Sequence, residues 1–154
     1  MGYSLKMLLF LSVLFYAANG LAFNCGVTTS PVNFINYDVF SLSPAYSTGV
    51  VTVNCNNPDR KPIPVTISIN SGGSGAFNPR RMRAATGSDR LNYYLFTDAS
   101  RTVIWGDGSG GTSTVTNLVA RHTPWYATLF GMLPPRQNLS AGKYSDTLLV
   151  TVTW

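Results

Sequence analysis

The sequence predicts an all-β domain built as an antiparallel sandwich. Apolar and polar residues alternate with a period of two in several short segments, the pattern of strands with one buried face. The 154 residues include 14 Gly and 9 Pro, which suit tight turns between short strands. They include no Glu, a residue that helices use on their solvent face. About seven strands joined by turns favour an immunoglobulin-like sandwich, with a barrel as the alternative.

Residues 1–22 have the pattern of a signal peptide. Lys6 precedes an apolar run of about a dozen residues, which is short of the roughly 20 that a membrane-spanning helix needs. Small residues follow the run, so we expect cleavage after Ala22, with cleavage after Gly20 as the alternative. The chain is therefore expected to be exported without membrane insertion, and residues 23–154 are expected to form one domain.

The two cysteines, Cys25 and Cys55, lie in the exported part. An even number of cysteines outside the cytoplasm predicts a disulfide, and closing this loop would stabilise the fold by about 3–4 kcal/mol. Zinc is a weaker alternative, because His122 is the only histidine and a zinc site needs four ligands. Lipidation of Cys25 is weaker still, since bulky Phe23 stands where lipoproteins carry small residues. We expect no metal and no cofactor.

Period-two alternation places seven strands along the exported part. In residues 50–55, Val51, Val53 and Cys55 share one face, which directs the second cysteine into the core. Residues 63–70 alternate branched apolar side chains with Pro, Thr and Ser, as a strand with one dry and one wet face does. The expected strands are residues 32–40, 50–55, 63–70, 91–97, 101–105, 125–131 and 144–154.

The last of these strands, residues 144–154, has an unusual composition. One of its faces is apolar and consists of Leu148, Val150, Val152 and Trp154. It contains no Lys, Arg, Pro or Gly, the residues that protect an exposed sheet edge from pairing with other chains. The strand is therefore either internal to a sheet or paired by something else.

The basic residues do not indicate a nucleic-acid partner. The formal charge of +5 includes Lys6, which leaves with the signal peptide. The densest basic patch runs from Arg80 to Arg83, near Arg90. A nucleic-acid surface carries more positive charge with aromatic residues interleaved, so we interpret this patch as a solvated loop.

The glycine-rich residues 106–111 resemble the nucleophile loop of a serine protease. A nucleophilic serine needs a histidine held by a carboxylate, but His122 is the single histidine of a chain too short for a two-barrel protease. A calcium loop is also disfavoured, because Asp107 is the only carboxylate in the stretch. We interpret the stretch as a hairpin loop and expect no catalytic residue.

Two parts of the chain carry a resemblance to a known family. The segment from Arg81 to Asp98, which contains Tyr93, precedes the motif Trp105-Gly106-Asp107-Gly108. The C-terminal half adds Phe130, Gly131, Pro134, Gln137, Gly142, Tyr144 and Asp146. With the two cysteines, this pattern resembles the spore coat protein U domain family, which also builds archaic (Csu-type) chaperone-usher pili. The residues expected to be structural in this motif are Tyr93, Asp98, Trp105, Gly106, Asp107, Gly108, Gly131, Gln137, Gly142 and Asp146.

The resemblance implies a sandwich that lacks its last strand. A strand from a periplasmic chaperone, and later from a neighbouring pilin-like subunit, would complete it, and an outer-membrane usher would be a further partner. The implied donor-strand groove and acceptor edge consist of Tyr144, Leu148, Val150, Val152 and Trp154. Many members of the family carry a donor segment before the first cysteine, whereas only Phe23 and Asn24 precede it here. We therefore expect an acceptor of the tip or minor type.

We accordingly expect a non-catalytic structural subunit of a secreted surface fibre (pilus) or coat, exported through the periplasm to the cell surface, where such fibres serve adhesion and biofilm formation. The alternative is a free-standing carbohydrate-binding or coat module that completes its own sheet. Its candidate stacking residues are Trp105, Trp125 and Tyr126. A small secreted hydrolase is disfavoured, because six Asp residues supply all the side-chain carboxylates.

Overall fold

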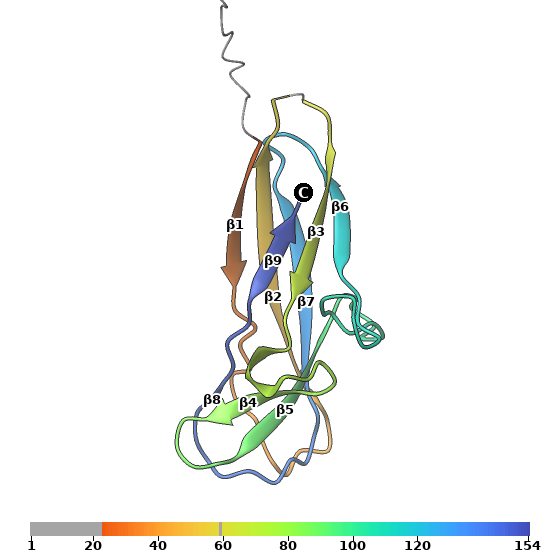
Figure 1. Ribbon diagram of the computed structural model, residues 1–154. Coiled ribbons are helices and arrows are strands. Elements are labelled where there is room, and N and C mark those ends of the chain that lie inside the picture. The colour runs from red at the N-terminus through yellow and green to blue at the C-terminus, as the bar shows by residue number, and fades with distance from the viewer. Residues whose placement is uncertain (1–22, 59) are drawn as a thin grey trace, which may run out of the picture.

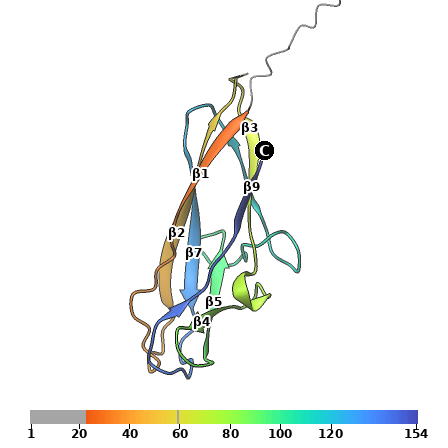
Figure 2. The same cartoon turned by 60° about the vertical axis from the view of Figure 1, so that its left-hand side comes forward.

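The structure is a computed structural model that describes residues 23–154 except residue 59, and it consists of two antiparallel sheets. The larger sheet has the strand order β1-β2-β7-β5-β4-β8, and the smaller has the order β6-β3-β9. Figure 1 and the turned view in Figure 2 show the two sheets facing each other. The elements are β1 (Asn24–Ser30), β2 (Ala45–Asn56), β3 (Ile63–Ile69), the 3-10 turn η1 (Gly72–Ser74), β4 (Arg80–Ala84), β5 (Arg90–Phe96), β6 (Val115–Val119), β7 (Trp125–Leu133), β8 (Tyr144–Ser145) and β9 (Val150–Thr153).

The core lies between the sheets and follows from the alternation in the sequence. In β2, Val51, Val53 and Cys55 are buried and the residues between them are more exposed. From the smaller sheet, β3 buries every second residue from Val65 to Ile69 against them. Each such side chain stabilises the fold by about 1.5–3 kcal/mol relative to an exposed one. The prediction of an all-β, immunoglobulin-like sandwich is confirmed.

Two expected strands do not form. Residues 32–40 have no ladder partner and belong to an irregular segment between β1 and β2, although Val32 and Phe34 pack against the core. Their alternation reflects packing against the core rather than pairing in a sheet. Residues 101–105 form only isolated bridges, from Ile104 to Phe96 and from Trp105 to Ser113.

The basic patch predicted to be a solvated loop is strand β4. Arg80 is fully buried, while Arg81 and Arg83 point to solvent. The period of two is present here, but it was hidden because the buried position carries a charged side chain rather than an apolar one.

The expected final strand, residues 144–154, is divided between the two sheets. β8 pairs with β4, where Ser145 lies opposite Arg83. After four residues outside any ladder, β9 pairs with β3, with Val150 opposite Ile69 and Thr153 opposite Thr66. The C-terminal segment therefore crosses from one sheet to the other, as the path of the chain in Figure 1 shows.

The predicted signal peptide lies outside the described residues. Within residues 23–154, leaving out 59, no helix has the length and hydropathy needed to cross a bilayer.

Candidate functional site

A cleft with a volume of about 1160 Å³ opens on the described part of the chain. It lies between residues 29–40, which include the end of β1, and residues 139–150, which lead into β9. Core side chains from the larger sheet form its floor, and these are Val51, Leu91, Leu95, Leu129 and Leu133. We call it the apolar cleft.

Both borders of the apolar cleft are backbone edges with a free side. Within the described residues, β1 pairs only with β2, and β9 pairs only with β3. The segments 31–38 and 146–149, which continue these edges along the cleft, belong to no ladder. An edge of this kind presents unpaired N–H and C=O groups that another strand can take up.

Of the five residues expected to form the acceptor edge, three line the apolar cleft and two lie outside it. Tyr144, Leu148 and Val150 line the apolar cleft. Val152 is partly buried against the core, and Trp154 is 54% exposed. The Trp154 ring packs against Phe23 with the ring centroids 6.1 Å apart, beyond the cleft.

A hydrogen-bond network fixes the chain where it leaves β8 and passes along the cleft. The Tyr93 hydroxyl, buried in the core, donates to Asp146 Oδ2 at 2.7 Å. Asp146 Oδ1 accepts from the backbone N–H groups of Gly73 and Thr147, each at 2.9 Å. Burial, followed by the bond to the Asp146 carboxylate, strongly raises the pKa of Tyr93, so the phenol stays protonated. These bonds hold the crossing segment in place.

Arg80 lies in the core beside this network, and sequence reasoning missed it. Its Nε and Nη2 donate to the carbonyl oxygen of Asn70 at 3.1 and 2.9 Å, and Nη2 donates to that of Trp105 at 2.7 Å. Its guanidinium stacks over the Phe77 ring, 5.0 Å from the centroid. Burial lowers the pKa of Arg80, and the nearby Tyr93 and Asp146 oppose that shift. Arg80 thereby ties β4 to the loops that follow β3 and β5.

The glycine-rich residues 106–111 form a tight, structural loop. Trp105 is fully buried, and its indole N–H donates to the Ile67 carbonyl at 3.3 Å. A Cβ on Gly106 would collide with the Thr112 side chain, so only glycine fits there. Asp107 accepts from the Ser109 hydroxyl at 2.6 Å, and this bond is the main cause of its lowered pKa. The serine thus serves a local turn, and Trp105 is not available as a surface stacking residue.

Asp98 and Gly108 also occupy turns. Asp98 accepts from the backbone N–H groups of Thr102 and Val103, and the bond from Val103 is the largest cause of its lowered pKa. Gly108 has a φ of 90°, a conformation that favours glycine.

Gln137, which lies 100 residues after Tyr37 in the sequence, holds residues 31–38, one border of the apolar cleft. The Gln137 side chain accepts from the Asn92 N–H at 2.8 Å and donates to the Asn92 carbonyl at 2.9 Å. The Gln137 backbone N–H donates to the Tyr37 hydroxyl at 2.9 Å. Gly131 lies under the same segment, because a Cβ there would approach Val32 to 2.5 Å and Phe34 to 2.7 Å. Gly142, in contrast, has no atom within 4 Å of its would-be Cβ.

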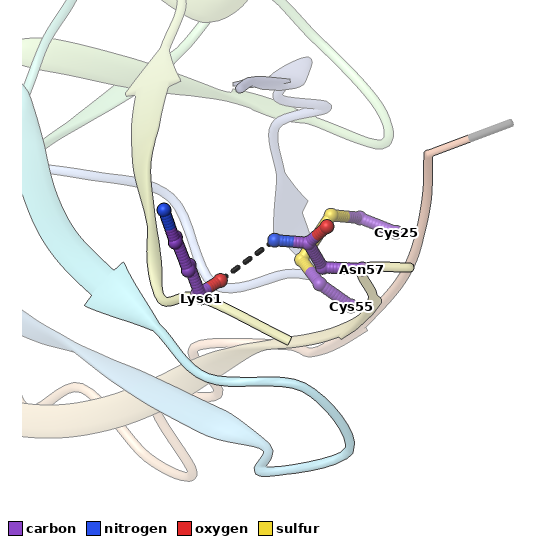
Figure 3. Close-up of a disulfide and its surroundings, with 4 residues drawn as sticks. All are labelled: Cys25, Cys55, Asn57 and Lys61. Atoms are coloured by element: carbon purple, nitrogen blue, oxygen red, sulfur yellow. Dashed lines mark hydrogen bonds between the residues drawn. A yellow bond between two sulfur atoms is a disulfide. The ribbon is translucent and has the colours of Figure 1, made fainter. Parts of the chain in front are cut away.

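The predicted disulfide is confirmed. Cys25 of β1 lies directly opposite Cys55 of β2, and the sulfur atoms are bonded (Figure 3). Nearby, the Asn57 side chain donates to the Lys61 carbonyl at 2.6 Å and holds the turn after β2. The bridge fixes the end of β1 that is remote from the apolar cleft.

These features define a class: a disulfide-linked, immunoglobulin-like sandwich with an apolar cleft between two open strand edges. The chain belongs to the Spore Coat Protein U domain family, whose model matches residues 12–151. It is 29% identical to Protein U of Myxococcus xanthus over 136 residues, which are 84% of this chain and 74% of that protein.

A solved structure supports the same class. The fold is similar to a chain in the CsuC–CsuE chaperone–tip adhesion subunit pre-assembly complex from the archaic chaperone-usher Csu pili of Acinetobacter baumannii, with a TM-score of 0.59 and 26% identity. The match covers 86% of this chain but only 40% of that one.

Proposed function

We propose that this chain is a non-catalytic structural subunit of a surface fibre of the pilus type, or of a coat, and that it takes up a β-strand of another chain in the apolar cleft. The observation that carries this proposal is a cleft floored by core side chains and bordered by two strand edges with a free side. Family membership and the likeness to a chain of a pilus pre-assembly complex support it.

An inserted strand would satisfy both features of the cleft at once. Every second side chain of the strand would enter the apolar floor, and its backbone would pair with the edge that runs from residue 146 into β9. Tyr144, Leu148 and Val150 would contact the inserted side chains. Val152 continues the same edge within β9, beyond the cleft, and Trp154 follows the strand directly, so both would lengthen the pairing.

The partners follow from this mode of assembly. A periplasmic chaperone would supply the first strand, a neighbouring subunit would replace it, and an outer-membrane usher would bring the two subunits together. This route requires export through the periplasm, with residues 1–22 as the signal peptide, and ends at the cell surface. The likeness to the complex of a chaperone with a tip adhesion subunit supports an acceptor of the tip or minor type.

Site-specific photo-cross-linking tests the proposal. A photoreactive phenylalanine analogue replaces either Leu148, which lines the cleft, or Leu149, which is 64% exposed and lies outside it. In cells that export the full chain, the probe at 148 should cross-link to a strand of a chaperone or of another subunit, and peptide mapping should locate that strand. The probe at 149 should give little of this product.

The opposite outcome is equally definite. A self-completing coat or carbohydrate-binding module predicts a stable monomer that forms no such product at position 148 and does not respond to an added donor peptide. That result would overturn strand uptake.

A further inference from the structure

A second cleft, of about 520 Å³, lies on the outer face of β4 and β5. Its basic side chains are Arg81, Arg83 and Arg90, Ser145 and Thr147 add hydroxyl groups, and Asp146 adds a carboxylate. The Ser74 hydroxyl also lines it but is bonded to backbone groups of residues 71 and 76. We call it the arginine cleft. Of its lining residues, only Ser145, Asp146 and Thr147 also line the apolar cleft.

The three arginines bring like charges close together on one face of the molecule. Arg83 lies directly opposite Arg90 in the β4–β5 ladder, an arrangement of like charges that destabilises a sheet. Arg81 is two residues along β4 and therefore on the same face. Across residues 23–154 without 59, neither Arg81 nor Arg83 has a hydrogen bond or ion pair to its side chain. Arg90 Nη1 donates only to backbone carbonyls, those of residues 88 and 89.

The carboxylates in and beside the arginine cleft accept hydrogen bonds from groups other than its arginines. Both oxygens of Asp146 accept hydrogen bonds, from Tyr93 on one side and from two backbone N–H groups on the other. Asp146 is also attracted to the buried Arg80. Asp89 attracts Arg90 and accepts from the Ser140 N–H at 2.8 Å. Three arginines therefore stand against two carboxylates, Asp146 in the lining and Asp89 beside Arg90, and the cleft keeps a net positive charge.

The lining identifies the chemistry of a ligand. Guanidinium groups bind carboxylate, sulfate and phosphate groups through paired hydrogen bonds, and hydroxyl groups suit the hydroxyls of a sugar. No aromatic or large aliphatic side chain lines the cleft, so it lacks the anchors that dominate protein–protein interfaces. Its volume lies within the range of small-ligand sites.

We propose that the arginine cleft binds an anionic polysaccharide, whose carboxylate or sulfate groups pair with Arg81, Arg83 and Arg90. The proposal does not depend on strand uptake, because the three arginines lie outside the apolar cleft.

Binding to defined polymers tests it on the exported full chain, in the assembly state in which it is purified. The probes are dextran sulfate, which carries only sulfate, polygalacturonate, which carries only carboxylate, neutral dextran and poly-glutamate. The chain should bind at least one of the two anionic polysaccharides and not neutral dextran, and added NaCl should weaken the binding because exposed charges are screened. The anionic polysaccharide that binds more tightly shows whether the arginine cleft prefers sulfate or carboxylate groups.

Two triple variants separate clustering from net charge. R81Q/R83Q/R90Q should weaken binding by about 10- to 100-fold, since each exposed charge pair contributes a small factor. R60Q/K61Q/R136Q removes the same number of charges from exposed positions outside the cleft and should leave binding within about threefold. R81K/R83K/R90K keeps the positive charge but lacks the paired hydrogen-bond donors of arginine, so its binding affinity should lie between those of the two glutamine variants.

Several outcomes would overturn the proposal. One is that the chain binds neither anionic polysaccharide, and another is that both glutamine variants lose the same amount of binding affinity. A third is that poly-glutamate binds more tightly than either polysaccharide, which would assign the cleft to an acidic protein segment. Circular dichroism on each variant excludes misfolding as the cause of a loss.

Discussion

Replacing Arg80 with methionine tests the buried network that joins β4 to two loops. The substitution removes three hydrogen bonds and leaves the carbonyl oxygens of Asn70 and Trp105 without these donors inside the protein. It keeps a long apolar side chain at a position with no exposed surface, so the loss of packing is small. The change in stability therefore reports on the polar contacts.

The magnitude follows from the donors and their burial. A hydrogen bond with a charged donor contributes about 1.5–3 kcal/mol. The expected loss is smaller than the sum of the three hydrogen bonds, because the variant also avoids the cost of burying a guanidinium whose Nη1 has no partner. Asp146 would in addition lose a nearby opposite charge. We expect a net loss of about 3–5 kcal/mol in the free energy of unfolding, or a fall of about 10–20 °C in Tm.

Urea unfolding of the chain, followed by tryptophan fluorescence, measures the loss, because the Trp105 ring is fully buried in the folded protein. The control is Arg81→Met, at the next residue but exposed, which should change stability by no more than about 0.5 kcal/mol. All variants are compared in the same assembly state. An Arg80→Met protein within about 1 kcal/mol of the wild type would refute the view that this network stabilises the fold.

Three further changes probe other parts of the fold. Replacing Cys25 and Cys55 by alanine should lower the free energy of unfolding by about 3–4 kcal/mol, measured by urea unfolding, and dithiothreitol should have no effect on that variant. The raised pKa of Tyr93 favours the folded state below pH 10, the ordinary tyrosine value, and this contribution is lost as the pH rises above it. The free energy of unfolding of Tyr93→Phe should therefore fall less steeply than that of the wild type between pH 9 and 12. An unchanged slope would contradict the raised pKa of Tyr93. Gly131→Ala should lower Tm because its Cβ has no room, by an amount equivalent to about 1–3 kcal/mol, whereas Gly142→Ala should leave Tm unchanged.

The strands that could be predicted are those with one apolar and one polar face. β2, β3, β5 and β7 all bury every second residue, and their hydrophobic pattern reveals it. β1 could not be found in this way, because it lies at an edge and only Cys25 of its seven residues is buried. β4 was missed because its buried position carries Arg80, whose charge is compensated by carbonyl groups that are distant in sequence.

The candidate site was predictable only in part. The composition of residues 144–154 predicted a strand that is either internal or paired by something else, and the family resemblance implied an acceptor edge there. Three of the residues named for that edge line the apolar cleft. The sequence did not reveal that the segment divides at Asp146, because the bonds that hold the crossing come from Gly73 and Tyr93. The opposite border was mistaken for a strand, since alternation records burial and not the presence of a pairing partner.

The crossing of the C-terminal segment also has a consequence for the order in which the sandwich forms. β1 and β2 are near in sequence and joined by the disulfide, so they can pair early. One edge of the smaller sheet is β9, the last described strand in chain order, and its partner β3 precedes it by about 80 residues. Contacts of such long sequence separation form slowly. Because the chain is synthesised from the N-terminus onward, the smaller sheet stays incomplete until β9 has been made, and the apolar core is exposed to aggregation for that time.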